Sequence, residues 1–204
     1  IYAGYMAKKM GLPMGKLIVA TNKNDILARA INSGEYKPNE VKATLTPSMD
    51  IQISSNFERL LFDISEQNEK RVINLMNDLK NKGSFSLGEK EISIIKDIFD
   101  AEAIDDNETI RIIRDFFNNF GFILDPHTAT AVGASYKVKN DLPTVVLGTA
   151  HPYKFADTVK LAINREVSTP EQVVALPDKK EKFEILDNNL QKVKNYILEK
   201  TQWK

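Results

Sequence analysis

Arg59 is the first residue whose surroundings suggest chemistry. Ser55 precedes Glu58 by three residues and an apolar run follows, which is the capping-box pattern of a helix start. A cation in a first helical turn is disfavoured by the positive end of the helix dipole. A bound anion would reverse that preference, because helix N–H groups and the forked guanidinium can converge on it. We consider an anion site at Arg59, against the alternative of a surface ion pair with Glu58 or Asp63.

Two threonines end short apolar runs that are typical of buried strands. Residues 17–21 end at Thr21 and residues 143–149 end at Thr149. In an open parallel sheet, ligands bind beyond the carboxyl ends of the strands. Thr21 and Thr149 are therefore candidates for ligand contact, although threonine also ends strands for packing or turn reasons.

The two histidines, His127 and His151, each lie next to a proline at the expected start of a helix. They are far apart in sequence, and neither a cysteine nor a metal-ligand spacing accompanies them. We expect structural or hydrogen-bonding roles for both and no metal site.

The elements that must position these residues alternate between helices and strands at both ends of the chain. Residues 1–10 are predicted as a helix ended by Gly11, and a helix over residues 26–31 is ended by Gly34. Asp125 is a predicted cap for a helix of small residues that could pack closely. The other expected elements are strands at 17–21, 41–45 and 143–149 and helices from residue 55, from residue 152 and around 190–197.

The middle of the chain shows helical periodicity. Apolar residues recur there every three or four positions, which predicts three amphipathic helices, the first ended by Gly83 and the third by Gly121. They are Val72, Leu75, Met76 and Leu79, then Ile92, Ile95 and Phe99, then Ile110, Ile113 and Phe117.

The pattern as a whole predicts an α/β chain with a three-layer, doubly wound and mostly parallel sheet and an inserted helical block. We expect an α/β part at residues 1–65 and the helical insertion at 66–121. The α/β part then returns at 122–165, and residues 166–204 form a C-terminal linker and helix.

Composition excludes several classes of protein. Of the 204 residues, 42% are hydrophobic and 27% are charged, which is typical of a globular chain. The 28 basic and 28 acidic side chains balance, so the excess positive charge that nucleic-acid binding needs is absent. No cysteine is present, and no apolar run approaches the ~18 residues of a membrane span. We expect a cytoplasmic protein without nucleic-acid or membrane partners.

The first residues resemble a helix already in progress. Ile1 has no preceding cap, and the chain does not begin with methionine. We expect a C-terminal portion of a longer protein, with exposed apolar surface that the rest of the protein would cover.

Several strings of the sequence resemble threonine synthase, in the same order. The most specific are residues 54–62 (Ser-Ser-Asn-Phe-Glu-Arg-Leu-Leu-Phe) and residues 149–155 (Thr-Ala-His-Pro-Tyr-Lys-Phe). The similarity spans about residues 1–165. Shorter matching strings are residues 3–8, 20–25, 47–51 and 125–129.

The resemblance implies a fold-type II enzyme similar in fold to the tryptophan synthase β-subunit, with pyridoxal 5′-phosphate as cofactor. The implied reaction is a carbon–oxygen lyase reaction that converts O-phospho-L-homoserine and water into L-threonine and phosphate. By resemblance, Thr149 contacts the cofactor's ring nitrogen. Together with the anion site considered above, the resemblance predicts that the substrate phosphate is bound by Arg59, Ser55 and Asn56.

The resemblance also implies which parts of the enzyme lie outside this chain. The Schiff-base lysine and a Gly-Asn-Phe-Gly loop for the cofactor phosphate belong to the N-terminal half of the family's chain. We therefore expect no catalytic residue here, an inactive isolated chain, the missing N-terminal half as a partner, and a monomer or homodimer.

Two other readings remain open from the sequence. Another fold-type II lyase or synthase would share the chemistry but would leave Arg59 unexplained, since its substrate would lack a phosphate. The second alternative is a noncatalytic threonine-synthase-like protein that binds phosphorylated ligands. The sequence upstream of Ile1 would discriminate among them.

Overall fold

The computed structural model describes residues 1–139 and 141–201 of the chain. The chain forms a first compact unit, Ile1–Ser168, and a second unit, Thr169–Lys204. Among the described residues, no helix combines the length and the apolar character needed to cross a membrane.

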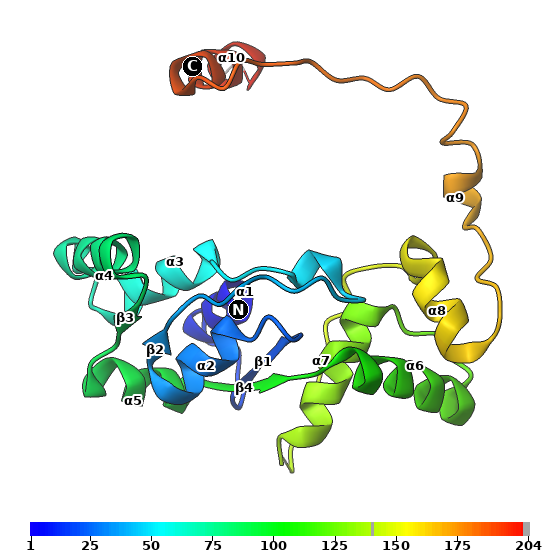
Figure 1. Ribbon diagram of the computed structural model, residues 1–204, viewed down its shortest axis with the longest axis horizontal. Coiled ribbons are helices and arrows are strands. Elements are labelled where there is room, and N and C mark those ends of the chain that lie inside the picture. The colour runs from blue at the N-terminus through cyan, green and yellow to red at the C-terminus, as the bar shows by residue number, and fades with distance from the viewer. Residues whose placement is uncertain (140, 202–204) are drawn as a thin grey trace. The chain divides into compact units, whose positions relative to one another are not determined.

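A pair of parallel strands lies at the centre of the first unit (Figure 1). β1 (Leu17–Thr21) pairs with β4 (Phe99–Ala103), with Thr21 opposite Ala103. The connection between them runs through several helices, as a parallel crossover requires. The predicted α/β class and the strand at 17–21 are confirmed.

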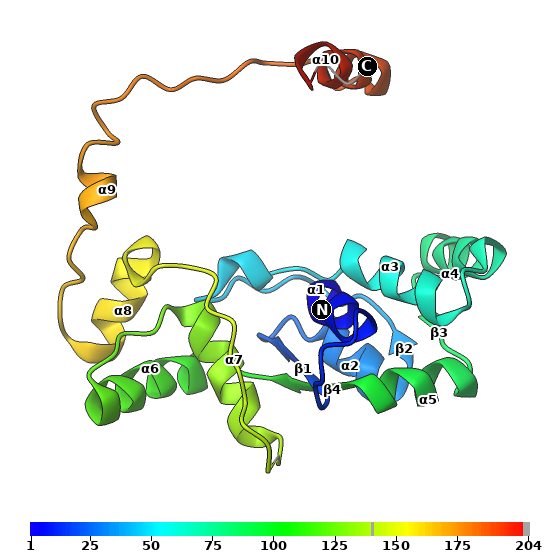
Figure 2. The same cartoon turned by 180° about the vertical axis from the view of Figure 1, so that it is seen from behind.

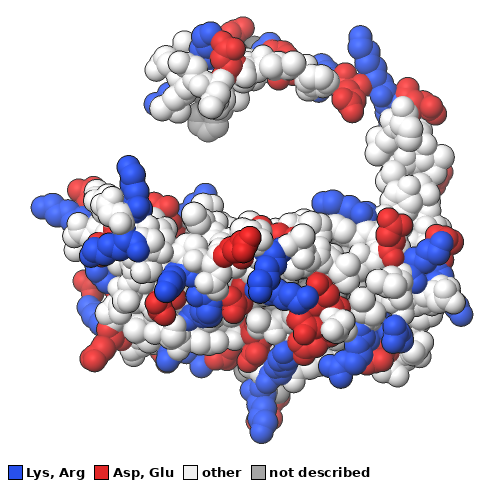
Figure 3. Space-filling model, in the orientation of Figure 1, with Lys and Arg blue, Asp and Glu red and all other residues white. Residues whose placement is uncertain are grey.

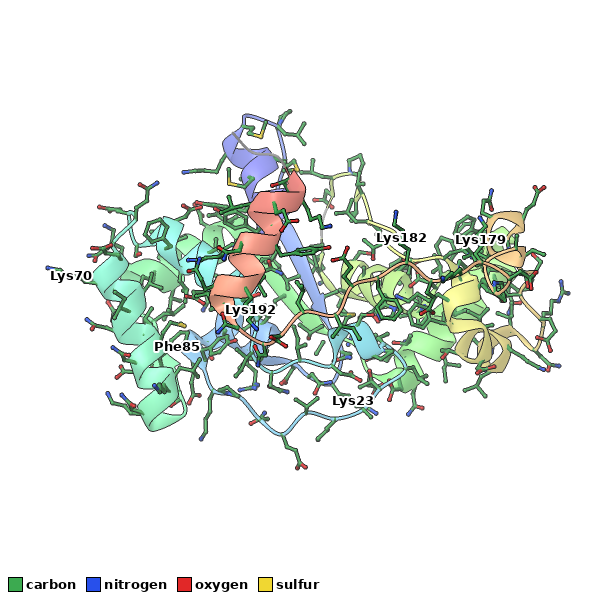
Figure 4. The ribbon with its side chains drawn as sticks, turned by 90° about the horizontal axis from the view of Figure 1, so that it is seen from above. Lys23, Lys70, Phe85, Lys179, Lys182 and Lys192 are labelled. Carbon is green, nitrogen blue, oxygen red and sulfur yellow. The ribbon has the colours of Figure 1, made fainter. Side chains whose placement is uncertain are left out.

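Five helices accompany the first part of the chain. The predicted ends of α2 (Ile26–Ser33) and α4 (Glu69–Lys82) are confirmed, because Gly34 and Gly83 adopt φ of 78° and 76°, a left-handed conformation that suits glycine. A short antiparallel pair of β2 (Glu35–Tyr36) and β3 (Phe85–Ser86) stacks Tyr36 on Phe85, with ring centroids 4.7 Å apart. Phe85 is labelled in Figure 4. The helices are α1 (Tyr2–Lys9), α2 (Ile26–Ser33), α3 (Ser55–Ile64), α4 (Glu69–Lys82) and α5 (Glu89–Ile98).

Three further helices complete the first unit: α6 (Asp106–Phe120), α7 (Pro126–Lys137) and α8 (Ala156–Ile163). Asp125 caps α7 as predicted, since its carboxylate accepts from the backbone N–H of His127 at 2.9 Å. The predicted close packing of α7 is also confirmed. A Cβ at Gly133 would lie 2.5 Å from Cδ1 of Ile112 on α6, so the two helices approach closely.

The two faces of β1 pack against different hydrophobic cores. Leu17 and Val19 contact the core of α1 to α5, whereas Ile18 and Ala20 contact the core of α6, α7 and α8. Successive side chains of a strand point to opposite faces, which explains the alternation. The parallel pair therefore has helices on both faces, the layered arrangement expected of a doubly wound fold (Figures 1 and 2).

Two predicted strands are wrong. Residues 41–45 form an irregular segment, and residues 143–149 form no ladder with any strand in the described part of the chain. Val145 and Leu147 are 84% and 71% exposed, so the apolar run is not buried either. Apolar, β-branched composition favours a strand locally, but a strand becomes stable only beside a neighbour that completes its hydrogen bonds.

The segment at residues 66–121 is not helical throughout, because β4 lies inside it. Phe99, which was predicted on the same helix face as Ile95, is the first residue of β4. Pairing with β1 overrides the helical spacing there, and Lys16 adds an ion pair to Asp100 at 3.1 Å. The division of the chain at residues 65, 121 and 165 stays a prediction.

The second unit contains α9 (Glu171–Val174) and α10 (Leu190–Thr201), joined by exposed residues. The predicted surface segment and final helix are confirmed. Lys179 and Lys182 are exposed in the joining segment, and Lys192 of α10 pairs with Asp187 (Figure 4).

Candidate active site

The candidate site begins at the carboxyl end of β1, where Thr21 and Asn22 are buried. The Asn22 Nδ2 lies 2.8 Å from Oγ1 of Thr46 and 2.7 Å from Oδ1 of Asp50. Its Oδ1 accepts from the backbone N–H of Asn24 at 2.8 Å. A buried amide is costly without such partners, so Asn22 ties the strand end firmly to the segments around it.

Asp50 accepts hydrogen bonds on both carboxylate oxygens. Its Oδ1 lies 2.9 Å from Nδ2 of Asn24 and 2.7 Å from Oγ1 of Thr44, and its Oδ2 lies 3.0 Å from the Thr44 backbone nitrogen. Bonds to an ionised acceptor are stronger than neutral ones. Asp50 therefore folds its own loop back against the end of β1.

The loop at residues 41–54, which contains the short 3-10 helix η1 (Pro47–Met49), is named here the strap loop. It leads directly into α3, and three more of its backbone N–H groups donate to side chains of separate elements. These bonds run from Leu45 to Asp106 of α6 (3.1 Å), from Ser48 to His127 of α7 (3.3 Å) and from Ser54 to Tyr36 of β2 (2.8 Å). The strap loop is thus fixed along most of its length.

His127 lies between the strap loop and the segment that precedes α8. Its Nε2 accepts from Ser48, and its ring lies 4.5 Å from the ring of Phe155, measured between centroids. Its Nδ1 faces Oδ1 of Asp125 at 3.5 Å and has no hydrogen-bond partner among the described residues. Burial lowers the pKa of His127, and the Lys154 ammonium lowers it further, while nearby carboxylates act in the opposite sense. The imidazole is therefore neutral near pH 7.

A depression of about 550 Å³ opens beside this contact. Thr44, Leu45 and Pro47 of the strap loop line one side of it. Residues 153–158, from the 3-10 helix η2 (Pro152–Phe155) into α8, line the other. His151 caps η2, because its Nδ1 accepts from the backbone N–H of Tyr153 at 3.1 Å. The hydrogen-bonding role expected of both histidines is confirmed.

Arg59 lies on the exposed side of α3, outside the residues that line the depression. The helix begins one residue earlier than the predicted capping box requires, with Ser54 as the N-cap and no side-chain cap bond, so Arg59 stands in the second turn. Its Nη1 donates to Oδ1 of Asn56 at 2.8 Å, and within the described part of the chain it forms no ion pair with Glu58 or Asp63. The capping box is wrong, because the backbone turns into the helix at Ser54. The exposed Ser55 and Asn56 remain beside the guanidinium.

Thr149 is exposed and lies in the segment that was wrongly predicted as a buried strand. The neighbouring Gly148 passes close to α7, since a Cβ there would lie 3.6 Å from Oγ1 of Thr128. The Thr149 hydroxyl is therefore accessible near the first turn of α7, rather than closing a buried strand.

Comparison with known proteins identifies the family. The family model "Threonine synthase, C-terminal" matches residues 128–197. Threonine synthase from Pseudomonas aeruginosa is 40% identical over 97% of this chain and 43% of its own. This chain belongs to the threonine synthase family. The crystal structure of PLP-bound threonine synthase from Brucella melitensis superposes with a TM-score of 0.85 at 45% identity, covering 96% of this chain and 42% of that one. The yeast enzyme's structure gives 0.82 at 38% identity, covering 98% and 45%.

The chain spans less than half the length of these threonine synthases. Within it, three of the strings that resemble threonine synthase meet in space at His127. Residues 47–51 supply the Ser48 donor, residues 125–129 supply the histidine itself, and residues 149–155 supply Phe155. A further string, residues 54–62, supplies the N-cap and most of α3 at the end of the strap loop.

The polar residues that shape the candidate site are not indicated by the sequence motifs. Asn22 and Asn24 directly follow a correctly predicted strand, so their amides were identifiable as candidates at the strand end. Asp50 carried no local signal, because its partners lie up to 28 residues away in sequence. The Ser48–His127 bond spans 79 residues, and no pattern in either string indicates it.

Proposed function

We propose that this chain supplies the C-terminal portion of a pyridoxal 5′-phosphate-dependent threonine synthase, which converts O-phospho-L-homoserine and water into L-threonine and phosphate. The observation that carries the proposal is the convergence of three family strings at His127, beside a depression whose lining residue Thr44 accepts a hydrogen bond from Asn22 at the carboxyl end of β1. Ligands of open α/β sheets bind at that edge. Family membership supports the same reading.

The residues present fit one end of the cofactor. The accessible Thr149 hydroxyl can donate a hydrogen bond to a neutral pyridine nitrogen, but it cannot stabilise a protonated ring as a carboxylate would. When bound, pyridoxal phosphate supplies the electron sink for elimination and water addition. An uncharged Thr149 hydroxyl at the ring nitrogen would leave the ring unprotonated and so a weaker electron acceptor, which would disfavour side reactions.

Arg59 is proposed to bind the substrate phosphate together with Ser55 and Asn56. The bond from Arg59 to Asn56 holds the guanidinium at the N-terminal half of α3, where exposed side chains of all three residues gather. A guanidinium fork matches two phosphate oxygens, and the helix N–H groups add favourable potential. This part of the chain binds and orients substrate.

The isolated 204-residue chain is proposed to be inactive, because the lysine that binds the cofactor covalently is expected in the N-terminal half of the enzyme. The test is a chimera in which the part of the P. aeruginosa relative that precedes its matched region is joined to Ile1. We expect the chimera to release phosphate and L-threonine from O-phospho-L-homoserine, and the 204-residue chain alone to release neither. Turnover by the isolated chain would contradict the proposal.

Two further measurements on the chimera separate the alternatives. Thr149→Ala should lose cofactor faster during dialysis, whereas Thr149→Ser should retain it because the hydroxyl remains. Efficient turnover of a substrate without phosphate would identify a different fold-type II enzyme. Binding of O-phospho-L-homoserine without turnover would identify a noncatalytic phospholigand-binding protein.

A further inference from the structure

His127 is the point where the strap loop, which leads into the proposed substrate-binding helix α3, meets the segment that carries Thr149. The strap loop contacts it through the Ser48 N–H, and the segment that carries Thr149 contacts it through the ring of Phe155. Its side chain is 9% exposed, whereas Ser48 is exposed and Phe155 is half-buried. Both partner segments are irregular or 3-10 and cannot hold their positions by regular backbone ladders alone.

The hydrogen bond to Ser48 specifies the protonation of the ring. A backbone N–H donates, so Nε2 must be an acceptor and carry no proton. In a neutral imidazole the single proton then resides on Nδ1, which faces Asp125. Protonation would place an N–H on Nε2 against the N–H of Ser48, and the bond would be lost.

The charges around the ring come from three elements. Asp125 lies at the start of α7 itself, Asp50 lies in the strap loop, and Lys154 belongs to η2. The two carboxylates favour an imidazolium, whereas burial and the Lys154 ammonium disfavour it, and the latter prevail because the pKa of His127 is lowered. The bond to Ser48 therefore persists somewhat below the pH at which an exposed histidine would titrate.

We propose that His127 is a positioning residue, whose neutral Nδ1–H imidazole holds the strap loop and the Thr149 segment in register so that substrate and cofactor meet correctly. The kinetic part of this inference rests on the proposed function. The structural part concerns only this chain's own residues and can be decided without cofactor or substrate.

The structural test is imidazole nitrogen NMR of the 204-residue chain at neutral pH. Its two histidines provide an internal contrast. His151 accepts on Nδ1 from Tyr153 and should be the Nε2–H tautomer, whereas His127 accepts on Nε2 and should be the Nδ1–H tautomer. The spectrum of His127→Gln lacks the His127 imidazole, so comparison with the parent spectrum assigns the nitrogen signals to the two histidines. An Nε2–H tautomer or an imidazolium at His127 would overturn the proposal.

Amide exchange adds a second structural readout. The Ser48 N–H should exchange at least tenfold faster, after correction for intrinsic rates, once pH falls below the His127 pKa. His127→Gln keeps an acceptor near the Nε2 position and cannot titrate, so its Ser48 protection should not change with pH. His127→Phe keeps a ring against Phe155 but removes the acceptor, and should lose Ser48 protection at every pH. Equal protection in His127→Phe and the parent chain would overturn the proposal.

The kinetic test compares the same variants in the active chimera. At pH 8, His127→Phe should lower kcat/KM at least tenfold, and His127→Gln should recover most of that loss. Between pH 7 and 5, kcat/KM of the parent enzyme should fall more steeply than that of His127→Gln. The substrate phosphate, with its second pKa near 6, titrates equally in both enzymes and cancels from the comparison.

His151→Gln is the matched control. Its kcat/KM should fall between pH 7 and 5 as steeply as that of the parent enzyme. Identical pH profiles for the parent and His127→Gln would show a merely structural role. If the chimera is inactive altogether, the proposed function fails, while the tautomer and exchange measurements still decide the role of His127.

Discussion

Arg59 extends from α3 and, among the described residues, has only Asn56 as a hydrogen-bond partner, so its guanidinium keeps donors for an anion. Bonds between charged partners contribute about 1.5–3 kcal/mol each. Arg59→Ala should therefore lower kcat/KM for O-phospho-L-homoserine about tenfold to a hundredfold, measured as phosphate release by the chimera. Arg59→Lys should recover only part, because a point charge lacks the fork.

The matched control is Arg111→Ala, which removes an exposed arginine from α6. Its kinetics should equal those of the parent. Unchanged kinetics in Arg59→Ala would assign Arg59 to the general surface and leave the substrate phosphate without its proposed partner.

At the scale of elements, Gly34 and Gly83 provide a matched pair of helix ends. Both have left-handed backbone, which costs a residue with a Cβ about 1–2 kcal/mol. An added Cβ at Gly34 would also lie 2.4 Å from Cδ1 of Ile92, whereas nothing lies within 4 Å at Gly83. Gly34→Ala should therefore destabilise the chain by about 1–3 kcal/mol more than Gly83→Ala.

Urea unfolding of the two variants measures this difference, with the slope of the transition unchanged in both. Equal losses of unfolding free energy in the two variants would show that Ile92 moves away without cost and that α2 and α5 are not tightly packed at this contact.

At the scale of the whole molecule, opposite charges are interspersed over the visible face of the first unit, in keeping with a net charge of zero (Figure 3). Among the Lys and Arg ion pairs of the described residues, one has the least exposed carboxylate side chain. Glu91 of α5 accepts from Arg71 of α4 through both carboxylate oxygens, at 2.8 and 2.7 Å. Its side chain is 12% exposed, so the pair is shielded from water more than the surface pairs are.

The pH dependence of folding should reflect this pair. The hydrogen bonds from Arg71 hold the pKa of Glu91 below the ordinary value of 4.5. As pH falls through that value, the unfolded chain takes up a proton before the folded chain does, so stability falls with pH. Glu91→Gln should cost about 1–3 kcal/mol at pH 7. The difference in unfolding free energy between Glu91→Gln and the parent should shrink as pH falls below 4.5. Urea unfolding at several pH values measures this difference.

Glu66→Gln is the control for this prediction. Glu66 pairs with Lys90 at 2.7 Å, but both side chains are more than three-quarters exposed. Removing an exposed pair should change stability little at any pH. A difference for Glu91→Gln that does not vary with pH would assign its effect to packing between α4 and α5 rather than to charge.

Features that depend on neighbouring residues could be read from the amino-acid sequence. The helices at residues 69–82 and 106–120 follow from apolar spacing, their ends follow from glycine, and β1 follows from a short apolar run between turn residues. The family strings were also readable, because they are contiguous. Local preference and local pattern carry all of this information.

Contacts between distant segments became apparent only in the folded molecule. Ala, Asp and Glu disfavour strands, yet residues 99–103 become β4 because β1 offers them a ladder, while the apolar residues 143–149 gain none. In the same way, Asp50 and His127 acquire their roles from partners tens of residues away. Such pairings depend on chain closure and shared burial, and these are properties of the folded molecule that no short window of sequence contains.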